Sequence, residues 1–172
     1  MIRMRIDGVD AILQRVDTMR KDLPRRQKLI LEKLAQFGID TAGVKFQSAQ
    51  YDGTNDVHME PPQWVNSNTV RVVASGRAVA FIEFGTGINY RDDHPKAAEF
   101  GAIRGSYGYG LGKLDAWMYD GEPGTNGYVI PGGANEGKVL TFGNPANRCM
   151  YDTAKAMRDK ILDIVKEVYG SG

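Results

Sequence analysis

The stretch that decides the predicted fold reads Arg77-Ala78-Val79-Ala80-Phe81-Ile82-Glu83-Phe84-Gly85-Thr86-Gly87. Its first eight residues alternate between an apolar face (Ala78, Ala80, Ile82, Phe84) and a mixed face, which is the period-2 pattern of a strand. We therefore expect a strand over residues 77–84 whose apolar face joins the core. Gly85 and Gly87 tolerate positive φ, so Glu83, Phe84, Gly85, Thr86 and Gly87 are predicted to form a turn that launches the following segment.

Upstream of this stretch, residues 69–74 are rich in β-branched side chains and Ser75-Gly76 is typical of a turn. The sequence therefore predicts a hairpin within residues 62–84. Residues 50–61 read as a loop, in which Asp52, Asn55 and Asp56 are ordinary turn formers.

Downstream, residues 85–137 show no sustained period and are predicted to form one long loop. Residues 85–143 hold 14 of the 21 glycines and five of the eight tyrosines. Disordered linkers are poor in aromatic residues, so this loop is expected to pack against something. Its candidate anchors for a subunit or partner interface are Tyr90, Phe100, Tyr107, Tyr109, Trp117 and Tyr119.

The flanking segments supply helices and two short strands. Residues 1–48 predict a strand at 2–6 and two helices divided before Pro24, the second with Leu29, Leu34 and Val44 on its buried face. A strand is expected at 138–142, and Asn144-Pro145 predicts the start of a helix that ends at Gly170. Residues 1–172 thus form a single α+β domain, with a small, mostly antiparallel sheet packed against helices.

Composition restricts the function. Hydrophobic residues make up 42% of the chain and charged residues 25%, the net charge is +1, and Cys149 is the single cysteine. These values favour a globular chain without a disulfide framework, a membrane span or a global basic field for nucleic acid. Charge is uneven: residues 1–48 carry +4 and residues 49–143 carry −4. Two solvated surfaces explain this, and so does docking between copies in a ring.

No catalytic or metal-binding pattern emerges, so we predict neither an enzyme nor a cofactor. The glycine run Gly105–Lys113 fails the phosphate-loop spacing, and Leu114 follows the lysine where a hydroxyl is needed. The two histidines are far apart in the sequence, unlike zinc ligands. Cys149 and His94 could pair as nucleophile and base, but nothing local supports this. Glu83 is interpreted as a strand-end charge that pairs with an arginine or caps a turn.

Two segments resemble a known family. Residues 77–87, ending in Glu83-Phe84-Gly85-Thr86-Gly87, and residues 143–151, Gly143-Asn144-Pro145-Ala146-Asn147-Arg148-Cys149-Met150-Tyr151, are similar to the tail-completion, or head–tail joining, proteins of long-tailed bacteriophages. The order of elements also agrees along nearly the whole chain. The family more often has an aromatic residue or a proline near Arg148-Cys149, so the match departs slightly there.

The resemblance implies a structural virion protein of the phage neck, assembled in the host cytoplasm. It implies a ring, typically a hexamer, between a head-side adaptor or stopper protein and the tail terminator or tail tube protein, with DNA passing through the lumen and no membrane partner. Alternatives are a tail-terminator or tail-tube subunit of the same particle and, more distantly, a small ligand-binding domain or enzyme that uses the glycine-rich loop. In a ring, Arg25, Arg26 and Lys28 could face the DNA channel.

Overall fold

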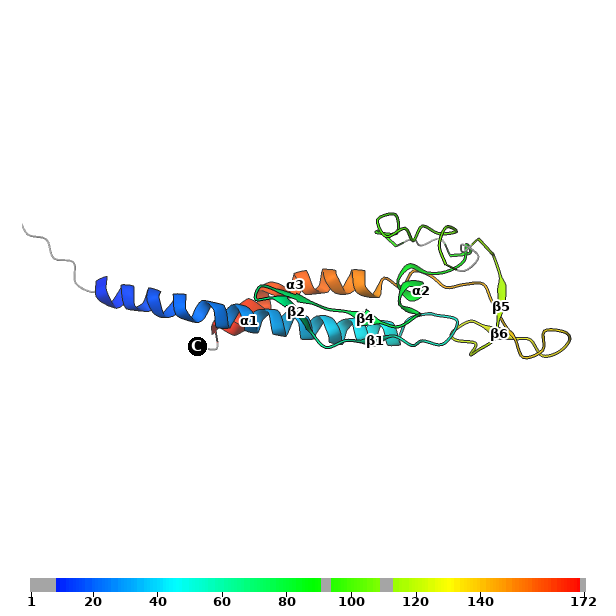
Figure 1. Cartoon of the computed structure of the whole chain (residues 1–172), viewed down its shortest axis with the longest axis horizontal. Coiled ribbons are helices and arrows are strands. Elements are labelled where there is room, and N and C mark those ends of the chain that lie inside the picture. The colour runs from blue at the N-terminus through cyan, green and yellow to red at the C-terminus, as the bar shows by residue number, and fades with distance from the viewer. Residues whose placement is uncertain (1–8, 91–93, 109–112, 171–172) are drawn as a thin grey trace, which may run out of the picture.

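The computed structural model describes residues 9–90, 94–108 and 113–170. The molecule is elongated: two long helices occupy one end, and loops with short strands occupy the other (Figure 1). Helix α1 spans Val9–Gln47, α2 spans Val79–Phe84 and α3 spans Cys149–Gly170. With three small antiparallel sheets among the described residues, these helices confirm the predicted α+β class. Within the described ranges, no helix combines the length and apolar character that crossing a membrane requires.

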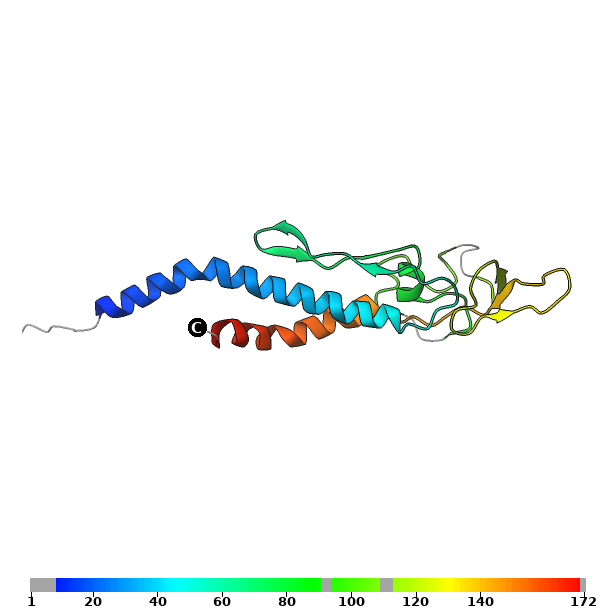
Figure 2. The same cartoon turned by 90° about the horizontal axis from the view of Figure 1, so that it is seen from below.

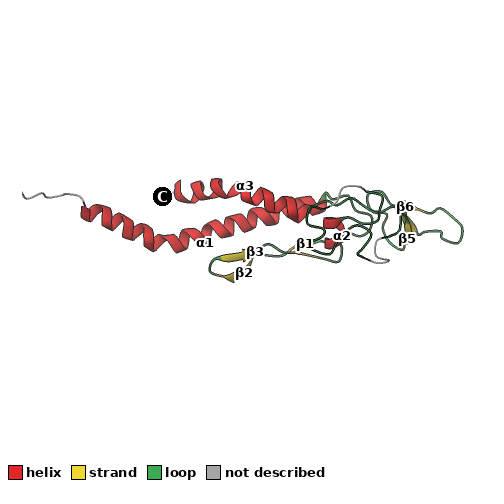
Figure 3. Cartoon of the chain, turned by 90° about the horizontal axis from the view of Figure 1, so that it is seen from above, coloured by secondary structure: helices red, strands yellow, loops and turns green. Residues whose placement is uncertain are grey.

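Helix α1 is continuous over 39 residues, so the expected division into two helices is wrong. Pro24 lies inside it, where its ring removes one backbone hydrogen bond without ending the helix. The helix bends in its N-terminal half instead, as expected for an internal proline (Figures 2 and 3). The strand predicted at residues 2–6 lies outside the described residues.

The C-terminal half of α1 packs antiparallel against α3 along a seam of small residues. Ala35 and Ala42 are fully buried, and a Cβ atom at Gly38 would lie 2.7 Å from the Met157 sulfur of α3. Gly38 therefore permits the close approach of the two helices. The buried face predicted for this stretch is only partly correct, because Val44 is 65% exposed.

The contact between α1 and α3 ends near Arg26, where α3 reaches its C-terminus. Arg26 Nη1 donates to the carbonyl of Val168 at 2.9 Å, and its guanidinium lies over the ring of Tyr169. Residues of α1 that precede Arg26 extend beyond the end of α3 (Figure 2). We call residues 10–25 the projecting stretch of α1.

The segment after α1 forms two short ladders. Strand β1 (His58–Met59) pairs with β4 (Ala74–Ser75), and β2 (Gln63–Asn66) pairs with β3 (Thr69–Arg71) as a hairpin. The hairpin lies beside α1 (Figure 3). A hairpin within residues 62–84 is therefore present, but its two arms are β2 and β3 rather than 69–74 and 77–84.

The strand expected over residues 77–84 is in fact the helix α2. Ala78 and Ile82 are both buried, and residues four apart share one face of a helix as they do one face of a strand. The helix begins next to a carboxylate: Asp56 accepts the backbone N–H groups of Arg77 and of the N-cap residue Ala78 at 3.0 and 2.9 Å. A carboxylate at this position satisfies donors that a helix start leaves unpaired.

Residues 85–137 are not a single irregular loop. They contain β5 (Trp117–Tyr119) and β6 (Tyr128–Val129), which pair on either side of β7 (Val139–Thr141). Strand β7 confirms the strand predicted at 138–142. Helix α3 begins at Cys149 rather than at Asn144-Pro145, because the side chain of Asn144 donates to the carbonyl of Phe81 instead of capping the helix.

Candidate functional site

Of the turn predicted at residues 83–87, Glu83 and Phe84 belong to α2, and residues 85–87 have the backbone conformation that the glycines suggested. Gly85 and Gly87 have φ values of 80° and 73°, in the region that favours glycine. A Cβ at Gly85 would lie 2.7 Å from the backbone nitrogen of Ala146. The turn therefore needs glycine at position 85 for conformation and for space, because a second segment passes directly against it.

That second segment is the other half of the family resemblance. Thr86 and Asn144 form an antiparallel bridge, with Thr86 N–H donating to the Asn144 carbonyl at 2.9 Å. Asn144 Nδ2 donates to the carbonyl of Phe81 at 3.0 Å, and the N–H groups of Asn147 and Arg148 donate to the carbonyls of Ile82 and Glu83. Residues 144–148 thus satisfy the carbonyls at the C-terminus of α2. We call the contact between residues 77–87 and 143–151 the junction.

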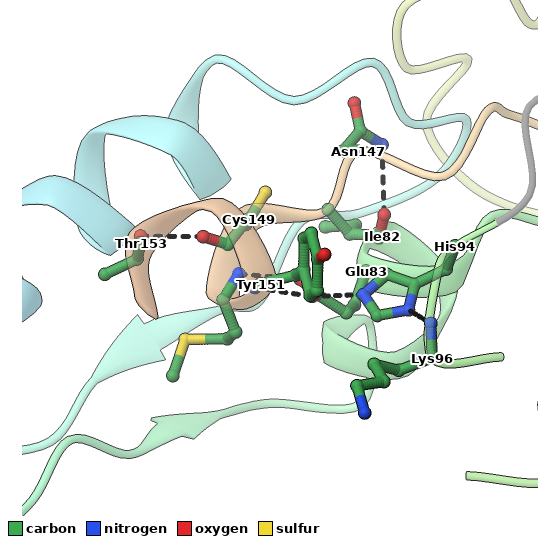
Figure 4. A network of polar contacts seen from close by, with 9 residues as sticks. Ile82, Glu83, His94, Lys96, Asn147, Cys149, Tyr151 and Thr153 are labelled. Carbon is green, nitrogen blue, oxygen red and sulfur yellow. Dashed lines mark hydrogen bonds and ion pairs between the residues drawn. The ribbon is translucent and has the colours of Figure 1, made fainter. Parts of the chain in front are cut away.

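Glu83 ties the junction to the start of α3. Its carboxylate is 5% exposed and accepts the backbone N–H groups of Met150 and Tyr151 at 2.8 and 3.0 Å (Figure 4). A carboxylate at a helix N-terminus is also stabilised by the helix dipole. Glu83 is therefore a cap, as one of the two interpretations of the sequence held, although it caps a helix rather than a turn.

The partner of Glu83 is His94 and not an arginine. His94 Nε2 lies 3.0 Å from Glu83 Oε1, and its Nδ1 accepts the N–H of Lys96 at 3.0 Å. Because Nδ1 is an acceptor here, Nε2 is the donor to Glu83. The ring packs edge-on against Phe84 and Tyr151, with centroids 4.5 and 5.3 Å away. This contact holds His94 and Lys96 against α2 and the start of α3.

The arrangement does not favour Cys149 as a nucleophile. Cys149 is 1% exposed, and burial, followed by the nearby charge of Glu83, raises the pKa of its thiol to about 12. A thiol in this state holds little thiolate near neutral pH. Both polar atoms of the His94 ring are engaged with Glu83 and Lys96.

Beyond the junction, three of the six predicted anchors meet in one open pocket of about 510 Å³. Tyr107, Trp117 and Tyr119 line it. Tyr51 and Phe81, which are not among the predicted anchors, also line the pocket, and Phe81 stacks on Tyr107 with centroids 6.4 Å apart. We call these five side chains and their surroundings the aromatic pocket.

The other predicted anchors lie elsewhere. Phe100 is 65% exposed and its ring contacts Phe84, with centroids 5.7 Å apart. Tyr90 is half-buried and outside the pocket lining. Tyr109 lies outside the described residues. Residue types alone could not show which of the six predicted anchors line the pocket, because the pocket combines segments that are more than 60 residues apart in the sequence.

Two acidic residues, Asp52 and Asp120, are part of the lining of the aromatic pocket. Asp52 accepts the N–H of Asn126 at 2.7 Å and the hydroxyl of Thr141 at 2.6 Å, which joins residues 51–54 to β7. Burial, together with the charge of Asp52 and other nearby groups, raises the pKa of Tyr119 to about 12. The pocket therefore has a mostly apolar lining that includes two carboxylates.

Asp52, Asn55 and Asp56 have structural partners. Asn55 Nδ2 donates to the carbonyl of Phe46 at 2.8 Å, Asp56 caps α2 and Asp52 contacts Thr141. Within the described ranges, no three potential ligands from histidine, cysteine, aspartate and glutamate cluster in a way that could hold a metal.

The three basic residues considered for a DNA channel are engaged within the chain. Arg25 and Arg26 contact Asp22 at 2.7 and 2.6 Å, and these two hydrogen bonds lower the pKa of Asp22 to about 2. Lys28 lies 3.8 Å from Glu32 and over the ring of Trp64. Their charge is therefore partly neutralised inside the subunit.

Comparison with known proteins gave no match: no protein-family model, curated protein or solved structure is significantly similar to this chain.

Proposed function

We propose that this chain is a ring-forming structural protein of the phage neck that joins the DNA-filled head to the tail. The observation that carries the proposal is the apolar surface that the described part of the subunit leaves exposed. Large apolar side chains there, such as Ile12 and Phe100, are 63% and 65% exposed. Contacts between copies in a ring would cover surface of this kind.

The character of this surface supports assembly. Large apolar side chains are exposed at both ends of the molecule, for example Met19 at 72% on α1 and Tyr128 at 58% on β6. Exposed apolar side chains that gather in one region of a surface mark interaction sites on proteins. An elongated subunit with apolar surface at each end is suited to bridging neighbours.

The phage neck as the location rests on the resemblance of residues 77–87 and 143–151. The junction supports it, because the two segments that carry the resemblance form one hydrogen-bonded unit. Proposed partners are further copies of this chain, a head-side adaptor or stopper, and the tail terminator or tail tube protein. DNA would pass through the ring without sequence-specific contacts.

The test uses particles assembled without this protein. We expect electron microscopy to show filled heads and separate tails of normal length, and purified protein to restore joining in vitro. Tails of uncontrolled length would favour the alternative role of a terminator. Infectious particles formed without the protein would refute the proposal.

The aromatic pocket favours a second candidate, a small-ligand-binding domain, because its volume lies within the usual range of about 300–1,000 Å³ for such sites. Thermal-shift screening with nucleotides and metal ions distinguishes the two. Reproducible stabilisation by one compound would favour this candidate, since a ligand that binds only the folded state raises the melting temperature.

A further inference from the structure

One end of the molecule carries an apolar helix face with no partner in the described chain. On the projecting stretch of α1, Ile12, Val16, Met19 and Leu23 follow each other at spacings of four, three and four residues, so they share one face. Their exposed fractions range from 52% to 72%. Arg15, Arg20 and Lys21 lie on the same stretch and form no ion pair with any described residue.

The other end carries a surface of complementary character. The aromatic pocket is open, and two of its lining residues, Leu114 and Met118, are 52% and 47% exposed. The described residues 113–122 include three acidic side chains and one lysine, and Asp52 adds a further negative charge. A pocket with an apolar lining and acidic rim fits an amphipathic helix that has basic residues beside its apolar face.

These two surfaces cannot meet within one molecule. The projecting stretch and β5, whose residues line the pocket, lie at opposite ends of the long axis, with the packed part of the α1–α3 pair and α2 between them (Figure 1). Contact between them therefore requires a second copy. Because the contacting surfaces differ, each copy still has one unused surface of each kind, which is the condition for a head-to-tail ring or filament.

We propose that the projecting stretch of α1 in one copy docks into the aromatic pocket of the next copy. The contact itself is inferred independently of the proposed function. Only the closed ring, as the final product of repeated contacts, rests on that proposal. Ile12, Val16 and Met19 would enter the pocket as apolar anchors, and Arg15 and Arg20 would face the acidic rim. Pairing of the projecting stretch with the same stretch of another copy is the competing arrangement.

Two variants test the contact on the purified full-length chain. Val16→Glu/Met19→Glu disables the helix face, and Asp120→Lys/Glu122→Lys reverses the charge of the exposed rim. All four side chains are exposed, so circular dichroism and thermal melting should match the unmodified protein. Each variant alone should remain a 19.0 kDa monomer, with self-association weakened by about a hundredfold or more.

Mixing the two variants provides the decisive readout. Each retains one working surface, so an equimolar mixture should form a heterodimer and nothing larger, as measured by sedimentation velocity or native mass spectrometry. A matched control, Leu162→Glu on the exposed side of α3, should assemble as the unmodified chain does. A second variant of the pocket, Leu114→Glu/Met118→Glu, should behave as the charge reversal does.

Three outcomes overturn the inference: unimpaired assembly of either variant, no heterodimer in the mixture, or a homodimer of the pocket variant through its intact helix face. A ring that persists in both variants would refute this contact and leave the neck function standing. Failure of the neck function would instead appear in the particles that lack the protein, where heads and tails would still join.

Discussion

At the scale of single residues, Glu83 holds together parts of the chain that are far apart in the sequence. Its two carboxylate oxygens receive Met150 N–H, Tyr151 N–H and His94 Nε2 at 2.8 to 3.0 Å. A buried acceptor with three donors cannot be replaced without leaving at least one of them unpaired. The stability of the junction therefore depends strongly on this side chain.

Replacing Glu83 with glutamine should destabilise the protein by about 2 kcal/mol, because the amide group turns a donor toward N–H groups and removes the negative charge at the start of α3. Urea unfolding measures the loss. Glu136→Gln, at an exposed position, is the control and should be nearly neutral. Equal stability of the two variants would show that the Glu83 network does not hold the junction.

Asp56 makes stability depend on acid pH. Its pKa is lowered from 3.8 mainly by the N–H groups of Ala78 and then Arg77. A lowered carboxylate pKa stabilises the folded state above the unfolded pKa, and this contribution is lost as pH falls through the folded value. Asp56→Ala should therefore be less stable than the unmodified chain at pH 7, and the difference should shrink below about pH 4. A difference independent of pH would contradict this account.

Residue chemistry allowed part of the junction to be predicted. The glycine requirement at Gly85 and Gly87 follows from residue type and turn pattern, and a capping role for Glu83 was one of two open interpretations. The identity of its partner could not be predicted, because His94 lies 11 residues further along the chain and meets Glu83 only in the folded structure.

At the scale of elements, two glycines inside α1 have opposite surroundings. A Cβ at Gly38 would approach Met157 Sδ to 2.7 Å, whereas a Cβ at Gly43 would lie 3.6 Å from Met59, an ordinary contact. Alanine is favoured over glycine inside a helix by about 1 kcal/mol. Gly43→Ala should realise that gain in full, while Gly38→Ala should lose part or all of it by displacing Met157.

The pair is its own control, because both substitutions change the same residue type in the same helix. Thermal or urea unfolding gives the comparison, and Gly38→Val should be clearly destabilising, since the added branches have no space between α3 and Val72. Equal gains from the two alanine variants would mean that the α1–α3 seam is looser than described.

Elements were predictable where pattern and packing agree. Strand β7 and helix α3 follow from strong local patterns. The observed start of α3 lies after the predicted one, because Asn144 bonds to Phe81 and Thr86. Helix α2 was mistaken for a strand because Ala78 and Ile82 satisfy both periods. Asp56, which accepts the N–H of Ala78 where the helix begins, is 22 residues upstream and therefore outside any local window.

At the scale of the whole molecule, the account depends on surface that the subunit alone does not bury. The sequence predicted an adhesive aromatic segment, and three of its six anchors do share one pocket. Tyr51 and Phe81 were missed because they come from other elements. The elongated shape was also not predicted, since Pro24 favours a helix boundary on local grounds and the sequence does not show where α3 ends relative to α1.

The mass of the assembled protein tests this claim most directly. Native mass spectrometry of the full-length chain over a range of concentrations should show a closed species at a fixed multiple of 19.0 kDa, with six copies expected from the family resemblance. The same ring should occupy the neck of intact particles. A 19.0 kDa monomer at every concentration, together with a neck that contains no ring of this protein, would contradict the account.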